Sequence, residues 1–447
     1  MSTSQTSSRK RLIGWGLTLG VVALAGVAGV AVIRLVPSNE ELALRAAAAL
    51  ETAVGIKVSV GAVHWRLFPR PTVVIEDVST QQAQPIKFNK VMFRPNLIGL
   101  WQKRVKFDIA DIEGAVIPQR SLRVLGAGKP AGVLPDDSGA GAGAGTWVID
   151  EIPLSQLVFR DVTWISHSGV PAIYSGEVDF DPAWRPRSAL IRRPEAKSVT
   201  DLTLTRKGPE DRWDMLVHIG GGKAAGVVEI QTQPTGRLHL AGKLQLDGVE
   251  VASAIEAFNR RAVISGNASG VTTLTANGDN AGELAQSLHT QTPFIMGPST
   301  LLRFDLSKAV RSLGKEHDGQ TPLNAVSGKL DTQNTANGMV IEFNGLKASS
   351  GVLTASGKAR LLNRNIDAEL AVDLVDGVVG IPLKVSGPLE KVSVSVPAGA
   401  IAGAVAGTAV LPGVGTAIGA RLGAALGNIF SPASEQAKAG TPGQSRR

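Results

Sequence analysis

The stretch Leu238–Leu246, L-H-L-A-G-K-L-Q-L, decides the fold class of this chain. Leu238, Leu240, Leu244 and Leu246 alternate with polar residues, and a β-strand places every second side chain on the same face of its sheet. The period of two therefore predicts a strand with one apolar face and one face in water.

The same alternation recurs in Trp213–Ile219, Ile366–Val372 and Val392–Val396. The chain has 51 glycines and 24 prolines, which favours many turns and short strands over long helices. We therefore predict that the body of the chain, from Trp147 onward, is mainly β. Short helices are expected to interrupt its strands at about 249–261, 281–289 and 305–313.

Helix and strand signals are mixed nearer the N-terminus. Ser38 and Glu41 form an S-x-x-E capping box, which predicts the start of a helix that ends near Val54. Strands are expected at 57–60, at 72–78, where β-branched residues gather, and around 105–109.

The segment 12–33 is predicted to cross a membrane. It contains 22 residues without a charge, and as a helix it would span about 33 Å, enough for a hydrocarbon core of about 30 Å. Arg9, Lys10 and Arg11 precede it, so the positive-inside rule places the N-terminus in the cytoplasm and the body outside. A cleaved signal peptide is the alternative, but its apolar region would usually be shorter.

Two other segments have a biased composition. The stretch 126–146 is a glycine- and alanine-rich linker without the spacing of a phosphate-binding loop. In the tail, glycines recur every four residues, which predicts two short helices with closely packing faces that turn back at Pro412. This hairpin could enter a membrane, pack on the body or stay unstructured. Its helix-packing glycines are Gly399, Gly403, Gly407, Gly415, Gly419, Gly423 and Gly427.

Composition excludes several classes of function. The chain has no cysteine, which excludes disulfides, thiolate metal sites and cysteine nucleophiles. The net charge of +8 fits ordinary solvated charge, or attraction to anionic lipid headgroups. Nucleic acid is not an expected partner, because the basic residues are not interleaved with stacking aromatics or set in a known reading motif.

A motif near the N-terminus carries a resemblance to a known family. The segment Thr52–Val78, T-A-V-G-I-K-V-S-V-G-A-V-H-W-R-L-F-P-R-P-T-V-V-I-E-D-V, resembles the amino-terminal signature of the AsmA family. Phe68, Pro69, Pro71 and Asp77 occupy the matching positions, whereas Val54 stands where the family often has threonine.

The carboxy-terminal half is also similar to that family in the order of its motifs, and the resemblance covers about two thirds of the chain. It implies an inner-membrane protein with a periplasmic body, related to TamB-like and bridge-like lipid transfer proteins. Those fold a long sheet into an open groove lined with aliphatic side chains.

Together these observations predict a mainly β fold with short helices. A transmembrane helix would precede an elongated, groove-like (taco-type) twisted β-sheet body, and a Gly/Ala-rich helical hairpin would follow it. The expected layout is a cytoplasmic tail (1–11), a transmembrane helix (12–33), an AsmA-like α/β module (38–125), a linker (126–146), an AsmA-like β-rich body (147–396), a helical hairpin (397–430) and a disordered tail (431–447).

The groove is expected to be lined by aliphatic residues from the alternating strands. For each of them, a place in an ordinary closed core is the competing interpretation. The candidate lining residues are Leu238, Leu240, Leu244, Leu246, Ile366, Leu370 and Val372.

The sequence does not suggest an enzyme. Its six histidines are scattered without H-E-x-x-H or another metal-ligand spacing, and no G-x-S-x-G elbow or dinucleotide fingerprint occurs. His218 and His239 lie on the polar faces of predicted strands, where we expect them to be solvated. No catalytic residue, metal site or cofactor is therefore predicted.

The expected function is that of an inner-membrane-anchored protein whose groove binds or conveys lipid in outer-membrane biogenesis or envelope lipid homeostasis. Its partners would be phospholipid acyl chains, the inner membrane and envelope proteins. The alternatives are a non-enzymatic scaffold that assists outer-membrane protein assembly by strand addition, and a closed domain with a regulatory role.

Overall fold

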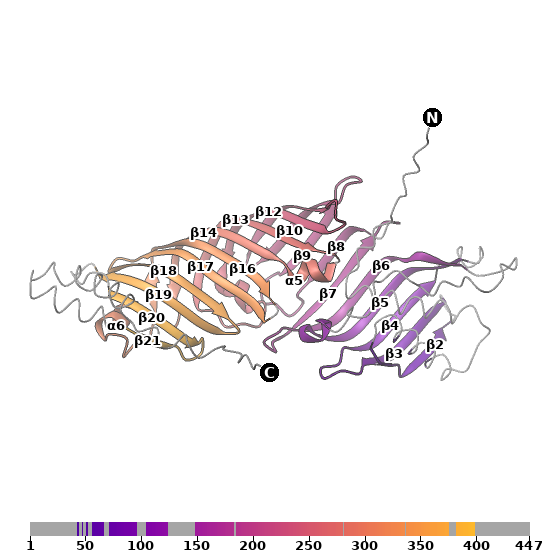
Figure 1. Cartoon of the computed structure of the whole chain (residues 1–447), viewed down its shortest axis with the longest axis horizontal. Helices are drawn as coiled ribbons and strands as arrows, with labels where there is room; N and C mark the ends of the chain where they lie inside the picture. The colour runs from indigo at the N-terminus through magenta and orange to yellow at the C-terminus, as the bar shows by residue number, and fades with distance from the viewer. Residues whose placement is uncertain are drawn as a thin grey trace, which may run out of the picture. The chain divides into compact units, whose positions relative to one another are not determined.

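The computed structural model describes residues 56–66, 71–95, 104–123, 148–182, 185–279, 281–335, 337–374 and 381–397, together with Ala43, Ala47 and Glu51. Strands dominate these residues and only a few short helices lie between them (Figure 1). The expected mainly β fold is therefore confirmed.

Between residues 56 and 279, the described part of the chain contains thirteen strands, a 3₁₀ helix and one short α-helix. They are β1 (Val58–Ser59), β2 (Ala62–Arg66), β3 (Thr72–Thr80), β4 (Lys87–Pro95), β5 (Arg104–Pro118), η1 (Gln119–Arg123), β6 (Val148–Ile165), β7 (Pro171–Phe180), β8 (Pro186–Arg192), β9 (Asp201–Arg206), β10 (Arg212–Ile219), β11 (Gly222–Thr232), β12 (Leu238–Glu250), α4 (Val251–Glu256) and β13 (Ile264–Gly278).

Eight further strands and two helices follow. They are α5 (Ala281–Gln286), β14 (His289–Leu301), α6 (Leu306–Arg311), β15 (Thr321–Leu323), β16 (Ala325–Thr335), β17 (Gly338–Ser349), β18 (Leu353–Leu362), β19 (Asn365–Leu374), β20 (Ile381–Pro388) and β21 (Ser393–Ser395).

The 21 strands belong to one sheet in which most strands pair with their neighbours in sequence. The pairings from β6 to β13 whose register is defined are antiparallel, as in a meander of hairpins, whereas β5 and β6 run parallel. Among the described strands, β1 and β2 pair with β3 at one edge, and β21 pairs with β20 at the other. The sheet is therefore open.

The chain divides into two compact units. The first contains Met1–Ala262, Asn267–Pro293 and Asp331–Val340, and the second contains Val263–Gly266, Phe294–Leu330 and Ile341–Arg447. The candidate residues of β12 fall in the first unit and those of β19 in the second.

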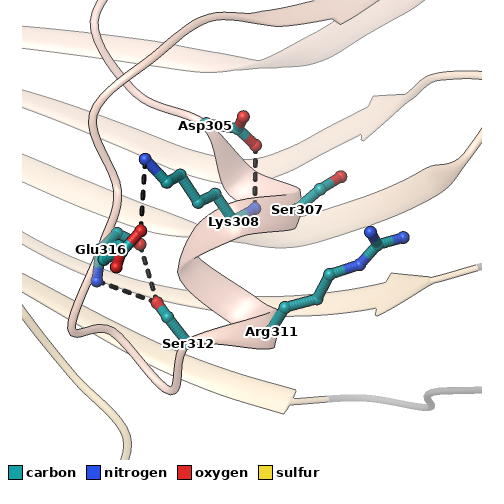
Figure 2. A pocket seen from close by; sticks show the side chains of 6 residues that line it. All are labelled: Asp305, Ser307, Lys308, Arg311, Ser312 and Glu316. Carbon is teal, nitrogen blue, oxygen red and sulfur yellow. Dashed lines mark hydrogen bonds and ion pairs between the residues drawn. The ribbon is translucent and has the colours of Figure 1, made fainter.

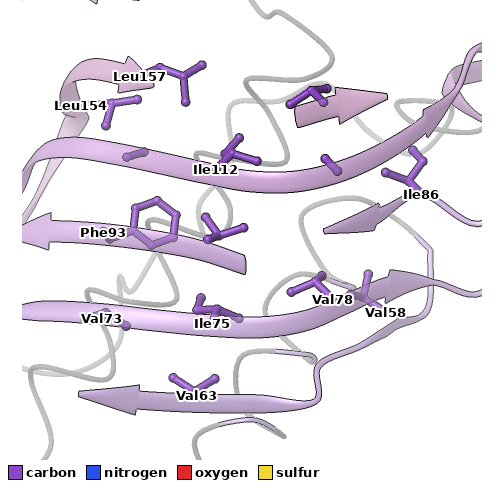
Figure 3. Close-up of a cluster of buried hydrophobic side chains, with 14 of the residues drawn as sticks. Val58, Val63, Val73, Ile75, Val78, Ile86, Phe93, Ile112, Leu154 and Leu157 are labelled. Atoms are coloured by element: carbon purple, nitrogen blue, oxygen red, sulfur yellow. The ribbon is translucent and has the colours of Figure 1, made fainter. Parts of the chain in front are cut away.

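A sealed apolar core occupies the N-terminal end of the first unit (Figure 3). Val63 lies opposite Ile75 in the register of β2 and β3, and the row continues through Val91 to Ile112. All four side chains are at most 2% exposed. Ala43, which is helical, belongs to the same cluster and covers part of this face. Burial of each such aliphatic side chain contributes about 1.5–3 kcal/mol.

The strands and helices expected from the sequence are largely confirmed. The periodic stretches correspond to β10, β12, β19 and β21, and the N-terminal signals correspond to β1, β3 and β5. The three body helices are present but shorter, as α4, α5 and α6. Glu250 and Asp305 are the N-cap residues of α4 and α6, and their carboxylates accept hydrogen bonds from backbone N–H groups of the first turn. Of the N-terminal helix, Ala43, Ala47 and Glu51 are described, and all three are helical.

Several predictions concern residues outside the described part of the chain. These are the membrane segment 12–33, the linker 126–146, the glycine hairpin after residue 397 and the motif residues Phe68 and Pro69. Among the helices that the structure does describe, none has both the length and the apolar character needed to span a bilayer.

The motif residue Asp77 has a structural role in β3. Its φ of 55° lies in the left-handed region, and it is left out of the pairing of β3 with β4, whose register is the same on both sides of it. Aspartate tolerates this backbone conformation better than most residues. Asp77 lies beside Gly61, whose N–H donates to the carbonyl oxygen of Glu76, and this is where the edge of the sheet passes from β1 to β2.

Candidate functional site

The candidate site is one face of strands β8–β13 in the first unit. Aliphatic side chains line this face, and we call it the apolar face. Its upper row crosses six strands in register and consists of Ile191, Leu202, Val217, Ala224, Leu246 and Gly270. The next row, two residues further along each strand, consists of Ala189, Leu204, Met215, Gly226, Leu244 and Thr272. The side chains of a row point the same way because paired residues share a face.

The apolar face is less completely buried than the core at the N-terminal end. Leu244, Ala224 and Val228 are 5–8% exposed, while Met215, Val217, Leu240, Leu246 and Leu274 pack against them and stay partly exposed. In the N-terminal core, by contrast, Val73, Ile75, Val91 and Phe93 are 0% exposed. The same face of the sheet is thus sealed at one end of the unit and half-open along β8–β13.

At one position of the apolar face, a glycine allows two neighbouring strands to approach closely. A Cβ atom on Gly226 would lie 1.9 Å from the carbonyl oxygen of Lys243 and 2.9 Å from the Cα of Leu244. The neighbouring strand therefore approaches more closely here than any other residue type would allow.

Helix α5 covers one corner of the apolar face. Leu284 is 5% exposed and forms a cluster with Leu238 and Ala276, against which Leu240 and Leu288 also pack. Leu238 is therefore a core residue of this corner, whereas Leu240 and Leu246 remain partly exposed.

The opposite face of β12 is polar, whereas on the neighbouring strands it also includes Leu190, Leu216 and Val271. On β12, Lys243 and Gln245 are exposed between the leucines of the apolar face. His218 Nδ1 lies 2.8 Å from Asp201 Oδ1, and His239 Nδ1 lies 2.8 Å from Asn277 Oδ1. The two histidines thus lie on the polar face, as expected, and each has a cross-strand partner that the sequence did not suggest.

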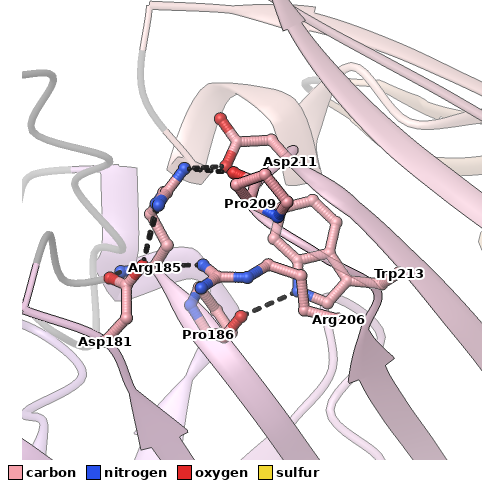
Figure 4. A network of polar contacts seen from close by, with 7 residues as sticks. All are labelled: Asp181, Arg185, Pro186, Arg206, Pro209, Asp211 and Trp213. Carbon is pink, nitrogen blue, oxygen red and sulfur yellow. Dashed lines mark hydrogen bonds and ion pairs between the residues drawn. The ribbon is translucent and has the colours of Figure 1, made fainter.

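A partly buried ionic network joins the turns at one end of these strands (Figure 4). The Asp181 carboxylate accepts hydrogen bonds from the Arg185 backbone N–H (2.9 Å), Arg185 Nε (3.0 Å) and Arg206 Nη1 (2.8 Å), and Arg185 Nη1 also donates to Asp211 (3.1 Å). Burial opposes ionisation of Asp181, but the hydrogen bonds from Arg185 and Arg206 outweigh it and lower the pKa of the carboxyl. Beside this network, Trp213 Nε1 donates to the Pro186 carbonyl oxygen at 2.8 Å.

The second unit has an apolar face of its own on β18–β20. Ile366, Leu370 and Val372 share one face of β19, and Leu370 lies opposite Gly357 on β18 and Leu383 on β20. Val372 is 0% exposed, so it is part of a sealed interior, while Ile366 and Leu370 are partly buried. Among the seven candidates, the partly exposed ones are therefore Leu240, Leu246, Ile366 and Leu370.

The apolar face also contains residues that the sequence did not single out as lining. Leu202, Leu204 and Leu274 join it through the strand register. The period of two predicted the strands correctly. Which residues of different strands lie on the same face depends on how the strands pair, and the sequence of a single strand does not determine this.

A polar hollow of a different kind surrounds α6 in the second unit (Figure 2). It is lined by charged and hydroxyl residues, and several of these already have partners: Asp305 caps the helix, and Lys308 Nζ lies 3.3 Å from Glu316 Oε2. This lining does not suit an acyl chain. Within the described ranges, no group of three or more histidine, aspartate or glutamate residues is placed to hold a metal ion.

Comparisons with known proteins do not assign the chain to a family. No family model, no curated protein sequence and no solved structure matches it.

Proposed function

We propose that the apolar face binds the acyl chains of membrane lipids, and that the protein handles lipid in the cell envelope while tethered by its N-terminal segment. The observation that supports this most directly is the pair of in-register rows in the first unit, in which Met215, Val217 and Leu246 stay partly exposed. A sheet with one apolar face must cover it, and an acyl chain is a suitable cover where no second layer seals the face.

The magnitudes are adequate for binding. Burial of a CH₂ group contributes about 0.8 kcal/mol, so a 16-carbon chain buried on one side would gain roughly half of 12 kcal/mol. Met215, an unbranched and adaptable side chain, lies near the middle of the face, where chains of different shape would be accommodated. Because the contacts are aliphatic, we expect selectivity for chain length rather than for headgroup.

A photocrosslinking experiment tests the proposal. A small diazirine amino acid is placed at Leu240 or Leu246 of the full chain in cells, with Gln245 on the polar face of the same strand as the matched control. After irradiation, mass spectrometry should find phospholipid adducts at the two leucine positions and few at Gln245.

The other outcomes are equally informative. Adducts with envelope proteins in place of lipid would favour the scaffold alternative, in which the sheet binds β-segments. Absence of lipid adducts at both leucine positions, with the variant folded and in the membrane fraction, would rule out acyl-chain binding on this face.

A further inference from the structure

Three segments of the first unit meet at one end of its strands. The turn 166–170 follows β6, the turn 193–200 follows β8, and the segment 257–262 follows α4. We call these three segments together the tip. The upper row of the apolar face, which includes Ile191 and Leu202, lies directly beside the turn 193–200.

Arg193 connects the segments of the tip through hydrogen bonds of its buried guanidinium. It is 5% exposed, and its guanidinium donates to the carbonyl oxygens of Ala257 (3.0 and 2.6 Å) and Ile173 (3.1 Å). The same group lies 5.1 Å from the ring centre of Tyr174 and 6.0 Å from that of Phe258. These contacts satisfy a buried charge and hold the segment after α4 against β7 and β8.

Arg260 and Asn259 join the segment 257–262 to the turn 166–170 and to Pro171, the first residue of β7. Arg260 Nη2 donates to the hydroxyl oxygens of Ser168 (2.7 Å) and Ser166 (3.2 Å), and Asn259 Nδ2 donates to the carbonyl oxygen of Pro171 (2.8 Å). The turn 193–200 is itself closed by the Arg193 N–H, which donates to the Thr200 carbonyl oxygen at 2.9 Å. Hydrogen bonds therefore hold the three segments of the tip together as one ordered surface.

This ordered surface presents large apolar side chains to water. Val199 is 71% exposed, the highest value among the large hydrophobic residues that the structure describes as exposed, and Phe258 is 40% exposed. The tip contains four basic residues, Arg193, Lys197, Arg260 and Arg261, and one acidic residue, Glu195. Lys197 and Arg261 are exposed, and the Lys197 side chain is 90% exposed although its Nζ lies 3.3 Å from Glu256.

We infer that the tip docks on the surface of an anionic lipid bilayer, with Val199 and Phe258 entering the headgroup region and the exposed Lys197 and Arg261 facing lipid phosphates. Exposed apolar side chains with a cationic surround are the pattern by which folded domains sit in a membrane interface. The charge excess matches anionic headgroups, and each basic residue near such a surface contributes to binding. Two apolar side chains are too few for the core of a stable protein–protein interface. The docking goes beyond acyl-chain binding and does not depend on it.

The absence of cysteine makes a direct test possible. A single cysteine at Val199, labelled with an environment-sensitive fluorophore, is introduced into the full chain held in phosphatidylcholine nanodiscs. Glu210, in the turn at the opposite ends of the same strands, supplies the matched control site. Vesicles of phosphatidylcholine alone, or mixed with phosphatidylglycerol, are then added. We expect a blue shift at position 199 with the anionic vesicles, quenching by brominated lipid in those vesicles, and little change at position 210.

A second variant makes the expectation quantitative. Reversal of two exposed charges, Lys197→Glu with Arg261→Glu, should weaken vesicle binding by roughly tenfold or more, and salt should weaken wild-type binding in the same direction. No spectral change at position 199 with anionic vesicles, or an equal change at position 210 or with neutral vesicles, would overturn the inference. Lipid adducts at Leu240 should survive the charge reversal, so failure of docking and failure of acyl-chain binding are distinguishable.

Discussion

At the residue scale, Asp181 shows how a single carboxylate organises one end of the first unit. It is 7% exposed and accepts hydrogen bonds from two arginines, one four residues away and one 25 residues away in sequence. Arg206 is itself only 10% exposed, so the pair is buried from both sides. Removal of one member of such a pair leaves the other charge buried without its partner, which costs more than the pair contributes.

We predict that Asp181→Asn lowers the free energy of unfolding by about 3 kcal/mol at neutral pH. Because folding lowers the pKa of Asp181 below its ordinary value of 3.8, its contribution is present above that value and is lost as the pH falls through the lower folded pKa. The wild-type protein should therefore lose more stability than the variant between about pH 5 and pH 2. Thermal unfolding across this range measures both effects.

Asp214→Asn is the matched control for this prediction. Asp214 pairs with Lys207 at the surface, where their side chains are 42% and 72% exposed, so its removal should change stability by less than about 1 kcal/mol. Equal losses in the two variants would contradict the account of Asp181.

At the element scale, short helices decide how much of each apolar sheet face is covered. Helix α5 has six residues, too few to be stable alone, and Leu284 anchors it in the corner formed with Leu238 and Ala276. In α4, by contrast, no residue is fully buried. The half-open character of the apolar face therefore follows from the small size of the elements that pack on it.

We predict that Leu284→Ala destabilises the first unit by about 2–4 kcal/mol, since it leaves a cavity beside Leu238. Hydrogen exchange should rise first in α5 and in the adjoining ends of β12 and β13. Gln286→Ala on the exposed side of the same helix is the control and should have little effect. Unchanged exchange in Leu284→Ala would show that α5 does not secure this corner.

How much could be predicted from the sequence is clearest at this scale. Alternation in Leu238–Leu246 correctly predicted a strand and the sorting of its side chains between two faces. The alternation could not distinguish Leu240, which stays partly exposed, from Leu238, which α5 covers. In the same way, the alternation in β19 did not indicate that Val372 is fully buried. Coverage depends on elements distant in sequence, and a pattern of period two contains no information about them.

The tip was beyond prediction for a related reason. The single residues that build it, Arg193, Asn259 and Arg260, are spaced without a pattern, and their acceptors are mostly backbone carbonyls and serines up to 94 residues away. In contrast, the helix caps at Glu250 and Asp305 are local, and the helices they begin were predicted near their observed positions.

At the scale of the whole molecule, the described residues form a sheet of 21 strands, and the short helices among them leave parts of its apolar faces exposed. Each of the two units has a partly exposed apolar face of aliphatic side chains and glycines, on β8–β13 in one and on β18–β20 in the other. A ligand that covers such a face in the folded protein stabilises it by mass action, since the unfolded chain does not offer the same surface.

We predict that a single-chain phospholipid, added below its micellar concentration, raises the unfolding temperature of the full chain after delipidation. At 100 times the dissociation constant, the gain would be about 2.7 kcal/mol, or a few degrees for a protein of this size. Met215→Asp, which places a charge in the middle of the apolar face, should abolish most of the gain, whereas Leu216→Asp on the opposite face should retain it. A gain of the same size in all three proteins would indicate binding elsewhere.

The meander has a consequence for how the chain can acquire its structure. From β6 to β12 each strand finds its partner only a short turn away, so contacts of low sequence separation can form one hairpin after another, at little cost in loop entropy. The parallel pairing of β5 with β6 is different, because β6 begins beside the start of β5, at the opposite end of that strand from the residue at which β5 ends. We therefore expect the slow step of folding to lie at that pairing, while the hairpins beyond it assemble progressively as the chain is delivered from its N-terminus.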